Sequence, residues 1–282
     1  MGDYAIELKG ISKGYETFQL KDINLMIPRG CITGLIGANG AGKSTTIKLI
    51  LDMIKKDSGE IEIFGQCHND NTLKERIGVV LDEVHFPEVL NLRDVNRIMK
   101  HVYKRWDEKM FFDYAEQFKL HHKKAFKEYS RGMKMKLGLA VALSHGAELL
   151  ILDEATSGLD PIIREELLDV FMTFVQDERH SILMSSHIIS DLEKVCDYIA
   201  FMHEGDLIFF EQKDDLIESH RLYKCSEEAL KALPPEAIIG YRKHLYGVEV
   251  LVRDHENIQN GVVDRASIED IMLFHTKEKT VC

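Results

Sequence analysis

The chain has 282 residues, of which 45% are hydrophobic and 29% charged, so it can form one large globular domain with an appendage and is not a disordered chain. Its 47 acidic residues outnumber the 36 basic ones, and the net charge of −11 argues against nucleic acid as the main partner. The five scattered cysteines, the charged N-terminal stretch and the lack of any apolar run of roughly 18 residues predict a soluble, intracellular protein.

The N-terminal part of the sequence alternates short β-rich runs with turns. Residues 5–9, 23–27 and 61–64 have the alternation of half-buried strands, whereas 31–36 (CITGLI) is a continuous apolar run, as in a fully buried strand. A glycine-rich loop follows this run, and a helical pattern covers 45–53. The order strand, glycine loop, helix can direct a helix N-terminus at an anion.

Helical spacing of apolar residues dominates from about residue 90 to 145, and β/α alternation then returns. The expected elements there are strands at 149–152, 181–185, 198–202 and 207–210 and a helix at 161–175 with proline in its first turn. Together these patterns predict an α/β core interrupted by a helical insertion.

The C-terminal segment has less regular spacing of turn-forming residues, with Pro234 and Pro235 and several glycines. A hairpin is expected within 238–252 and a last helix at 268–275. We therefore expect two domains, residues 1–212 and a small accessory domain at 213–282.

The segment from Gly37 to Ser44 matches the phosphate-loop pattern G-x-x-x-x-G-K-[ST] at every fixed position. Its glycines let backbone N–H groups turn inward around phosphate oxygens. Lys43 can reach the β- and γ-phosphates, and the Ser44 hydroxyl can contact Mg²⁺. Because a buried strand precedes this loop and a helix follows it, we interpret the segment as a nucleotide-binding site. Its candidate residues are Gly37, Ala38, Asn39, Gly40, Ala41, Gly42, Lys43, Ser44 and Thr45.

Two carboxylates, Asp153 and Glu154, follow the apolar run at 149–152. Ligands of open α/β sheets bind at the C-terminal ends of strands. One carboxylate there can hold Mg²⁺ while the next orients or deprotonates an attacking water. We assign Asp153 to the metal and Glu154 to the water; without the phosphate loop, a solvated turn would be the simpler interpretation.

Four further segments follow the phosphate loop in a fixed order: residues 129–133 (YSRGM), 149–154, 157–160 (SGLD) and Ser186–His187. This ordered set resembles the ATP-binding cassette (ABC) ATPases, the nucleotide-binding subunits of ABC transporters, over about residues 4–212. The resemblance implies a P-loop NTPase core of the ABC type that hydrolyses ATP with Mg²⁺. An N-terminal antiparallel β part, a helical subdomain at about 90–145 and a small C-terminal α+β appendage would complete the fold.

The resemblance also implies roles for residues at the nucleotide. Tyr15 would stack on adenine, with Phe18 as the weaker candidate, and an ordinary surface aromatic is the alternative. His187 would contact the γ-phosphate and help to align the water, so that Glu154, His187 and Lys43 form the catalytic set.

Further implied residues would act across a dimer. Ser130 and Gly132 would bring a hydroxyl, backbone N–H groups and a helix dipole to the γ-phosphate held by a second subunit. Asp160 would belong to the loop that links the two sites.

The sequence departs from the family pattern in two places. The signature, usually LSGGQ, reads YSRGM, with Arg131 in place of the first glycine and Met133 in place of the glutamine. Such forms are similar to those of the bacterial drug- and antibiotic-export branch. Asp82 stands where the family has a glutamine that contacts Mg²⁺ and senses the membrane partner. Aspartate still offers an oxygen ligand; in the alternative, Asp82 faces solvent, and Glu83 or a water fills this role.

The resemblance favours the ATP-hydrolysing subunit of an exporter, acting with a second copy or a paralogue and with transmembrane permease subunits that dock near 85–95. The chain would then be cytoplasmic and peripheral on the inner face of the cell membrane. One alternative is a soluble ABC-type ATPase of translation, DNA repair or cluster assembly, but the sequence has neither a second cassette nor a long coiled-coil insertion. The other is a regulator without turnover, against which Glu154 and His187 argue.

Overall fold

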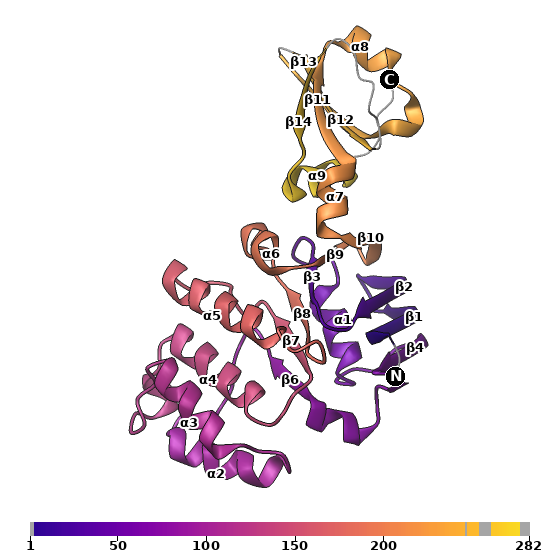
Figure 1. The fold of residues 1–282 in the computed structure, drawn as a ribbon. Helices are drawn as coiled ribbons and strands as arrows, with labels where there is room; N and C mark the ends of the chain where they lie inside the picture. The colour runs from indigo at the N-terminus through magenta and orange to yellow at the C-terminus, as the bar shows by residue number, and fades with distance from the viewer. Residues whose placement is uncertain (1–2, 246, 254–260, 277–282) are drawn as a thin grey trace.

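The computed structural model describes residues 3–245, 247–253 and 261–276 and arranges them around three β-sheets (Figure 1). The N-terminal sheet has the strand order β2-β1-β4-β5, and its neighbouring strands are antiparallel. Its strands are β1 (Tyr4–Gly14), β2 (Gln19–Pro28), β4 (Ser58–Ile63) and β5 (Gln66–Cys67).

The central sheet has the order β10-β9-β3-β8-β7-β6, in which only β10 is antiparallel to its neighbour. Every residue of β3, β7 and β8 is buried, as expected for parallel strands covered on both faces. The strands are β3 (Ile32–Ile36), β6 (Ile77–Val80), β7 (Leu149–Asp153), β8 (Ser181–Ser185), β9 (Tyr198–His203) and β10 (Asp206–Gln212).

Alternating side chains of the central sheet divide the core in two. Leu149 and Ile151 pack with the N-terminal sheet and α1 (Lys43–Ile50), whereas Leu150 and Leu152 pack with the helices on the other face. Those helices include α5 (Pro161–Phe174) and α6 (Ile189–Val195).

The helical insertion contains α2 (Leu92–Val102), α3 (Glu108–Gln117) and α4 (Arg131–Leu143), which lie together beside β6 in Figure 1. Side-chain caps begin these helices. The last turns of α4 approach β6 closely at Gly78. A Cβ atom on Gly78 would lie only 2.6 Å from the carbonyl oxygen of Ala142, so glycine permits this approach. The insertion therefore lies against β6, the edge strand of the central sheet.

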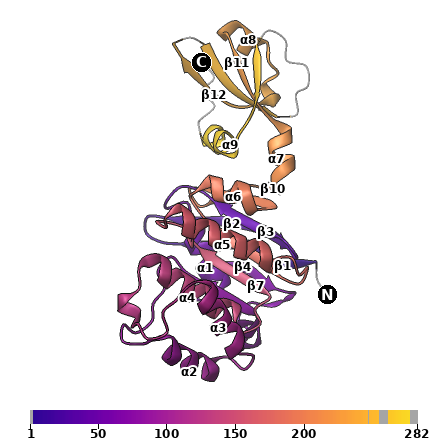
Figure 2. The ribbon, with the colours of Figure 1, turned by 60° about the vertical axis from the view of Figure 1, so that its left-hand side comes forward.

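The C-terminal residues form a separate lobe, joined to β10 by α7 (Lys213–Ser219) (Figure 2). Its sheet has the antiparallel order β12-β13-β11-β14. The expected domain boundary at 212/213 falls at the junction of β10 and α7. The lobe contains β11 (His220–Cys225), α8 (Glu227–Ala232), β12 (Ile238–His244), β13 (Gly247–Arg253), β14 (Val262–Arg265) and α9 (Ile268–His275).

The structure confirms the predicted fold class, including the N-terminal antiparallel sheet, the α/β core, the helical insertion and the α+β appendage. Short 3₁₀ turns at Asn71–Arg76, Phe126–Glu128 and Pro235–Ala237 complete the described elements. The helix expected at 45–53 instead begins at Lys43, directly after Gly42, and ends at Ile50. It ends early because Asp52 adopts a left-handed backbone with φ 53°. No helix of the described ranges is long and apolar enough to cross a membrane.

Candidate nucleotide-binding site

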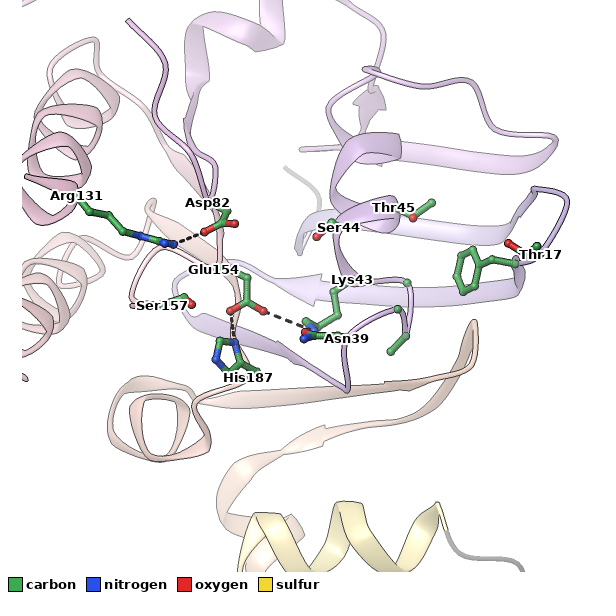
Figure 3. A pocket seen from close by; sticks show the side chains of 14 residues that line it. Thr17, Asn39, Lys43, Ser44, Thr45, Asp82, Arg131, Glu154, Ser157 and His187 are labelled. Atoms are coloured by element: carbon green, nitrogen blue, oxygen red, sulfur yellow. Dashed lines mark hydrogen bonds and ion pairs between the residues drawn. The ribbon is translucent and has the colours of Figure 1, made fainter. Parts of the chain in front are cut away.

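The loops that follow β3, β6, β7 and β8 meet at one edge of the central sheet and enclose a cavity of about 720 Å³ (Figure 3). The turn between β1 and β2 and the first residue of α4 complete its walls. The carboxyl ends of parallel strands collect at such an edge, which is the usual ligand site of open α/β sheets. The cavity is lined by Thr17, Phe18, Asn39, Gly40, Ala41, Gly42, Lys43, Ser44, Thr45, Asp82, Arg131, Glu154, Ser157 and His187.

The phosphate loop forms the floor of this cavity. Lys43 is only 5% exposed, and its Nζ donates to the carbonyl oxygen of Gly37 at 2.8 Å and to that of Ala38 at 3.4 Å. Gly42 is the N-cap residue of α1 and has φ 113°, a backbone conformation that residues other than glycine rarely adopt. The loop thus holds a buried ammonium at a helix N-terminus, an arrangement that fits the phosphates of a nucleotide.

Two of the three predicted metal ligands, Ser44 and Asp153, lie next to each other. Ser44 Oγ donates to Asp153 Oδ1 at 3.2 Å, and Ser185 Oγ donates to the same oxygen at 2.5 Å. In the described ranges, no group of three or more His, Cys, Asp and Glu residues could hold a metal alone. Mg²⁺ typically binds through one or two carboxylates plus substrate phosphates, so the Ser44–Asp153 donor set fits Mg²⁺ that arrives with a nucleotide.

Glu154 points into the cavity from a strained backbone. Its φ is 53°, and its N–H donates to Ser185 Oγ at 3.0 Å. Glu154 Oε1 lies 3.6 Å from Lys43 Nζ, and Oε2 lies 2.6 Å from His187 Nδ1 (Figure 3). The structure therefore brings the three predicted catalytic residues into one cluster, in which a carboxylate held by a histidine can accept a proton from water.

Asp82 and Arg131 form another part of the cavity wall. The Arg131 guanidinium donates to Asp82 Oδ1 at 2.6 Å, so Asp82 reaches the cavity but already has a cationic partner (Figure 3). Glu83, the alternative to Asp82, lines a neighbouring groove instead and pairs with His85 at 3.1 Å.

The two candidate aromatic residues differ in their position relative to the cavity. Phe18 lines the cavity, whereas Tyr15 lies outside the lining, is 50% exposed and has its ring centroid 6.4 Å from that of Phe18. Phe18 is therefore the better placed of the two for contact with a nucleotide base.

The residues expected to act across a dimer do not line this cavity. Ser130 Oγ caps α4 by accepting from the Met133 N–H at 3.3 Å, and the Asp160 carboxylate caps α5. Gly132 is buried in the first turn of α4, where a Cβ atom would lie 2.6 Å from Ile163 Cδ1. Ser130 and Asp160 are both exposed, so a second molecule can reach them.

Sequence reasoning missed several residues of the site: Thr17, Arg131, Ser157 and Ser185. Ser157 lies in the SGLD segment that the resemblance had already marked. Ser185 ends a buried apolar strand directly opposite Asp153 in the register of β7 and β8. The polar residue at the end of this apolar strand could have marked Ser185 as a site residue. Its hydrogen-bond partner Asp153 could not be predicted, because the pairing depends on the strand order.

Comparison with known proteins agrees with this geometry. The family model of ABC transporters matches residues 20–157. The bacitracin transport ATP-binding protein BcrA of Enterococcus faecalis is 36% identical over 230 residues, which cover 78% of this chain and 73% of that protein. BcrA of Bacillus licheniformis is 33% identical over 92% of this chain and 83% of its own length. A solved ATP-binding subunit of an ABC transporter has a TM-score of 0.68 and 29% identity, over 76% of this chain and 92% of that one. The chain thus belongs to the ABC transporter family, as an ATP-binding protein with ATPase activity.

Proposed function

We propose that two subunits bind ATP with Mg²⁺ between them and that its hydrolysis drives export through separate transmembrane subunits. The observation that carries this proposal is the division of the site. The phosphate loop, Glu154 and His187 share one cavity, and Asp153 accepts a hydrogen bond from Ser44 in its lining, whereas Ser130 lies outside the lining on an exposed helix N-terminus. The site of one chain is therefore incomplete, and the partner subunit's Ser130 would close it.

The residues would divide the work as follows. Lys43 and the N-terminus of α1 bind the β- and γ-phosphates, and Ser44 and Asp153 hold the metal, which when bound would neutralise charge on the phosphate oxygens. Glu154 Oε2 lies 2.6 Å from His187 Nδ1, and Oε1 lies 3.6 Å from Nζ of Lys43, the residue that would bind the γ-phosphate. Glu154 accepts the proton of the attacking water, and the partner subunit's Ser130 supplies donors to the γ-phosphate.

A groove beside the nucleotide cavity supports docking of a permease. It has a volume of about 370 Å³ and lies between the loop after β6 and the start of α4, and His85, Phe86 and Glu88 of the segment expected to dock are part of its lining. Next to it, Val89 exposes 75% of its surface, although it is a large apolar residue. The relatives that are named for bacitracin transport favour export of a peptide antibiotic as the process powered.

The docking role is tested by co-expression with the product of the adjacent reading frame, where that frame encodes a membrane protein with spans of permease length. The chain should sediment with membranes only when that protein is present. Val89→Asp should lower the membrane-bound fraction several-fold, because it places a charge on the apolar contact. Val262→Asp is the matched control, since Val262 is also an exposed valine (61%) but lies in the C-terminal sheet.

A chain that stays in the supernatant with and without the membrane protein would instead support the soluble ABC-type ATPase that is not coupled to transport. Retention of Val89→Asp on the membrane at the level of the unmodified chain would place the docking surface elsewhere.

A further inference from the structure

The ion pair between Arg131 and Asp82 lies between two cavities. Arg131 Nη2 and Asp82 Oδ1 are 2.6 Å apart, and the side chains are 51% and 53% exposed. These two residues line both the nucleotide cavity and the groove beside it, and they are the members that the two linings share. They join the first residue of α4 to the loop after β6.

The same guanidinium also lies beside the loop after β7. A Cβ atom on Gly158 would lie 3.3 Å from Arg131 Cζ, so the glycine leaves room for the arginine to pass. Gly158 has φ 67°, which also favours glycine. This loop carries Ser157, which lines the nucleotide cavity, and Asp160. The Arg131 side chain therefore extends from α4 to two further segments of the nucleotide cavity.

Two departures from the family pattern, Arg131 in the signature and Asp82 in the loop after β6, are thus spatial partners. A neutral glycine and a neutral glutamine are replaced by Arg131 and Asp82, and the new charges pair with each other. A half-exposed ion pair contributes little to stability, so this pair is easily exchanged for another partner. The exchange partner for a carboxylate at this cavity is a cation that arrives with the nucleotide.

A guanidinium and a divalent cation on one carboxylate repel each other, because both are positive and lie within a few ångströms. We propose that Arg131 is a positioning residue that competes with Mg²⁺ for Asp82. In the resting subunit, Arg131 holds Asp82 and ties the signature end of α4 to the loop after β6. Occupation of the site by Mg-ATP releases Arg131, so that nucleotide binding changes the position of the helix end that meets the second subunit. This inference rests on the proposed function, because it requires a metal at the nucleotide.

The test measures binding, not turnover. The Mg²⁺ concentration that half-saturates binding of a fluorescent ATP analogue is determined for the unmodified chain, Arg131→Ala, Asp82→Asn and the double variant. Arg131→Ala should lower this concentration by about two- to fivefold, the range that an exposed ion pair provides. Asp82→Asn should raise it. The double variant should match Asp82→Asn, because Arg131 acts only through Asp82.

Three controls separate this role from a structural one. In EDTA, Arg131→Ala should bind the analogue as tightly as the unmodified chain does. Arg131→Lys should restore most of the normal Mg²⁺ dependence, because it keeps the charge. Arg97→Ala should change nothing, although it removes another exposed ion pair, that with Asp94 on α2 at 3.5 Å.

An unchanged Mg²⁺ dependence in Arg131→Ala would overturn the inference. The inference would also fail if Arg131→Ala shifted the half-saturating Mg²⁺ concentration equally in the chain with Asp82 and in the chain with Asp82→Asn. Either result leaves the proposed function intact if the unmodified chain still requires Mg²⁺ for tight binding. If the unmodified chain binds the analogue equally well in EDTA and in Mg²⁺, the proposed role of the metal fails, and the inference fails with it.

Discussion

Replacing Glu154 by glutamine is expected to lower ATP turnover by about 10²- to 10⁴-fold, the range that a general base contributes. Glutamine has nearly the same shape but cannot accept the proton of the attacking water at neutral pH. ATP should still bind, because Lys43, Ser44 and Asp153 remain. Steady-state ATPase assays give the turnover, and equilibrium titration with a fluorescent ATP analogue gives the affinity.

The control for this substitution is Glu165→Gln. Glu165 is an exposed glutamate on α5 that pairs with Lys194 at 2.6 Å, away from the residues that line the cavity. Its turnover should be unchanged. Near-normal ATPase activity in Glu154→Gln would remove Glu154 from the role of base.

Replacing Lys43 by alanine should weaken ATP binding by about 10- to 100-fold. A hydrogen bond to a charged group is worth about 1.5–3 kcal/mol, and each 1.4 kcal/mol is a factor of ten in affinity. Lys43 Nζ also lies 3.6 Å from Glu154 Oε1, so its loss removes an ammonium group that pairs with this carboxylate. Isothermal titration with ATP and Mg²⁺ measures the effect.

Lys48→Ala is the matched control for this variant. Lys48 lies on the same helix, α1, but is exposed and does not line the cavity. Equal affinities for Lys43→Ala and the unmodified chain would contradict a phosphate-binding role for Lys43.

Much of the site could be predicted because each part follows a buried parallel strand. The apolar runs before Gly37, Asp153 and Ser186 marked β3, β7 and β8, and the ends of parallel strands meet at one edge of a sheet. The positions of Lys43, Glu154 and His187 in one cluster follow from these strands together with the motif order.

The contacts between loops could not be predicted in the same way. The bond from Ser185 to Asp153 depends on β8 lying beside β7 in a particular register. The pair of Arg131 and Asp82 joins residues 49 positions apart, and the direction of a long, half-exposed side chain has no periodic pattern in the sequence.

The C-terminal lobe shows a related limit. The hairpin expected within 238–252 is confirmed as β12 and β13, and the last helix is confirmed as α9 with the expected bounds. β14 was not expected, because all four of its residues are exposed and it therefore lacks the alternation of a half-buried strand. It is defined only by pairing with β11.

The central claim is that one ATP site needs two chains, and sedimentation velocity of Glu154→Gln tests it most directly. With saturating Mg-ATP, this variant should sediment as a dimer, because the nucleotide between the subunits is not cleaved; without nucleotide it should be a monomer. Adding Ser130→Arg should prevent the dimer while ATP still binds, since the bulky side chain would stand at the partner's γ-phosphate. A chain that stays monomeric at saturating Mg-ATP, or that dimerises equally well with Ser130→Arg, would contradict the two-subunit site.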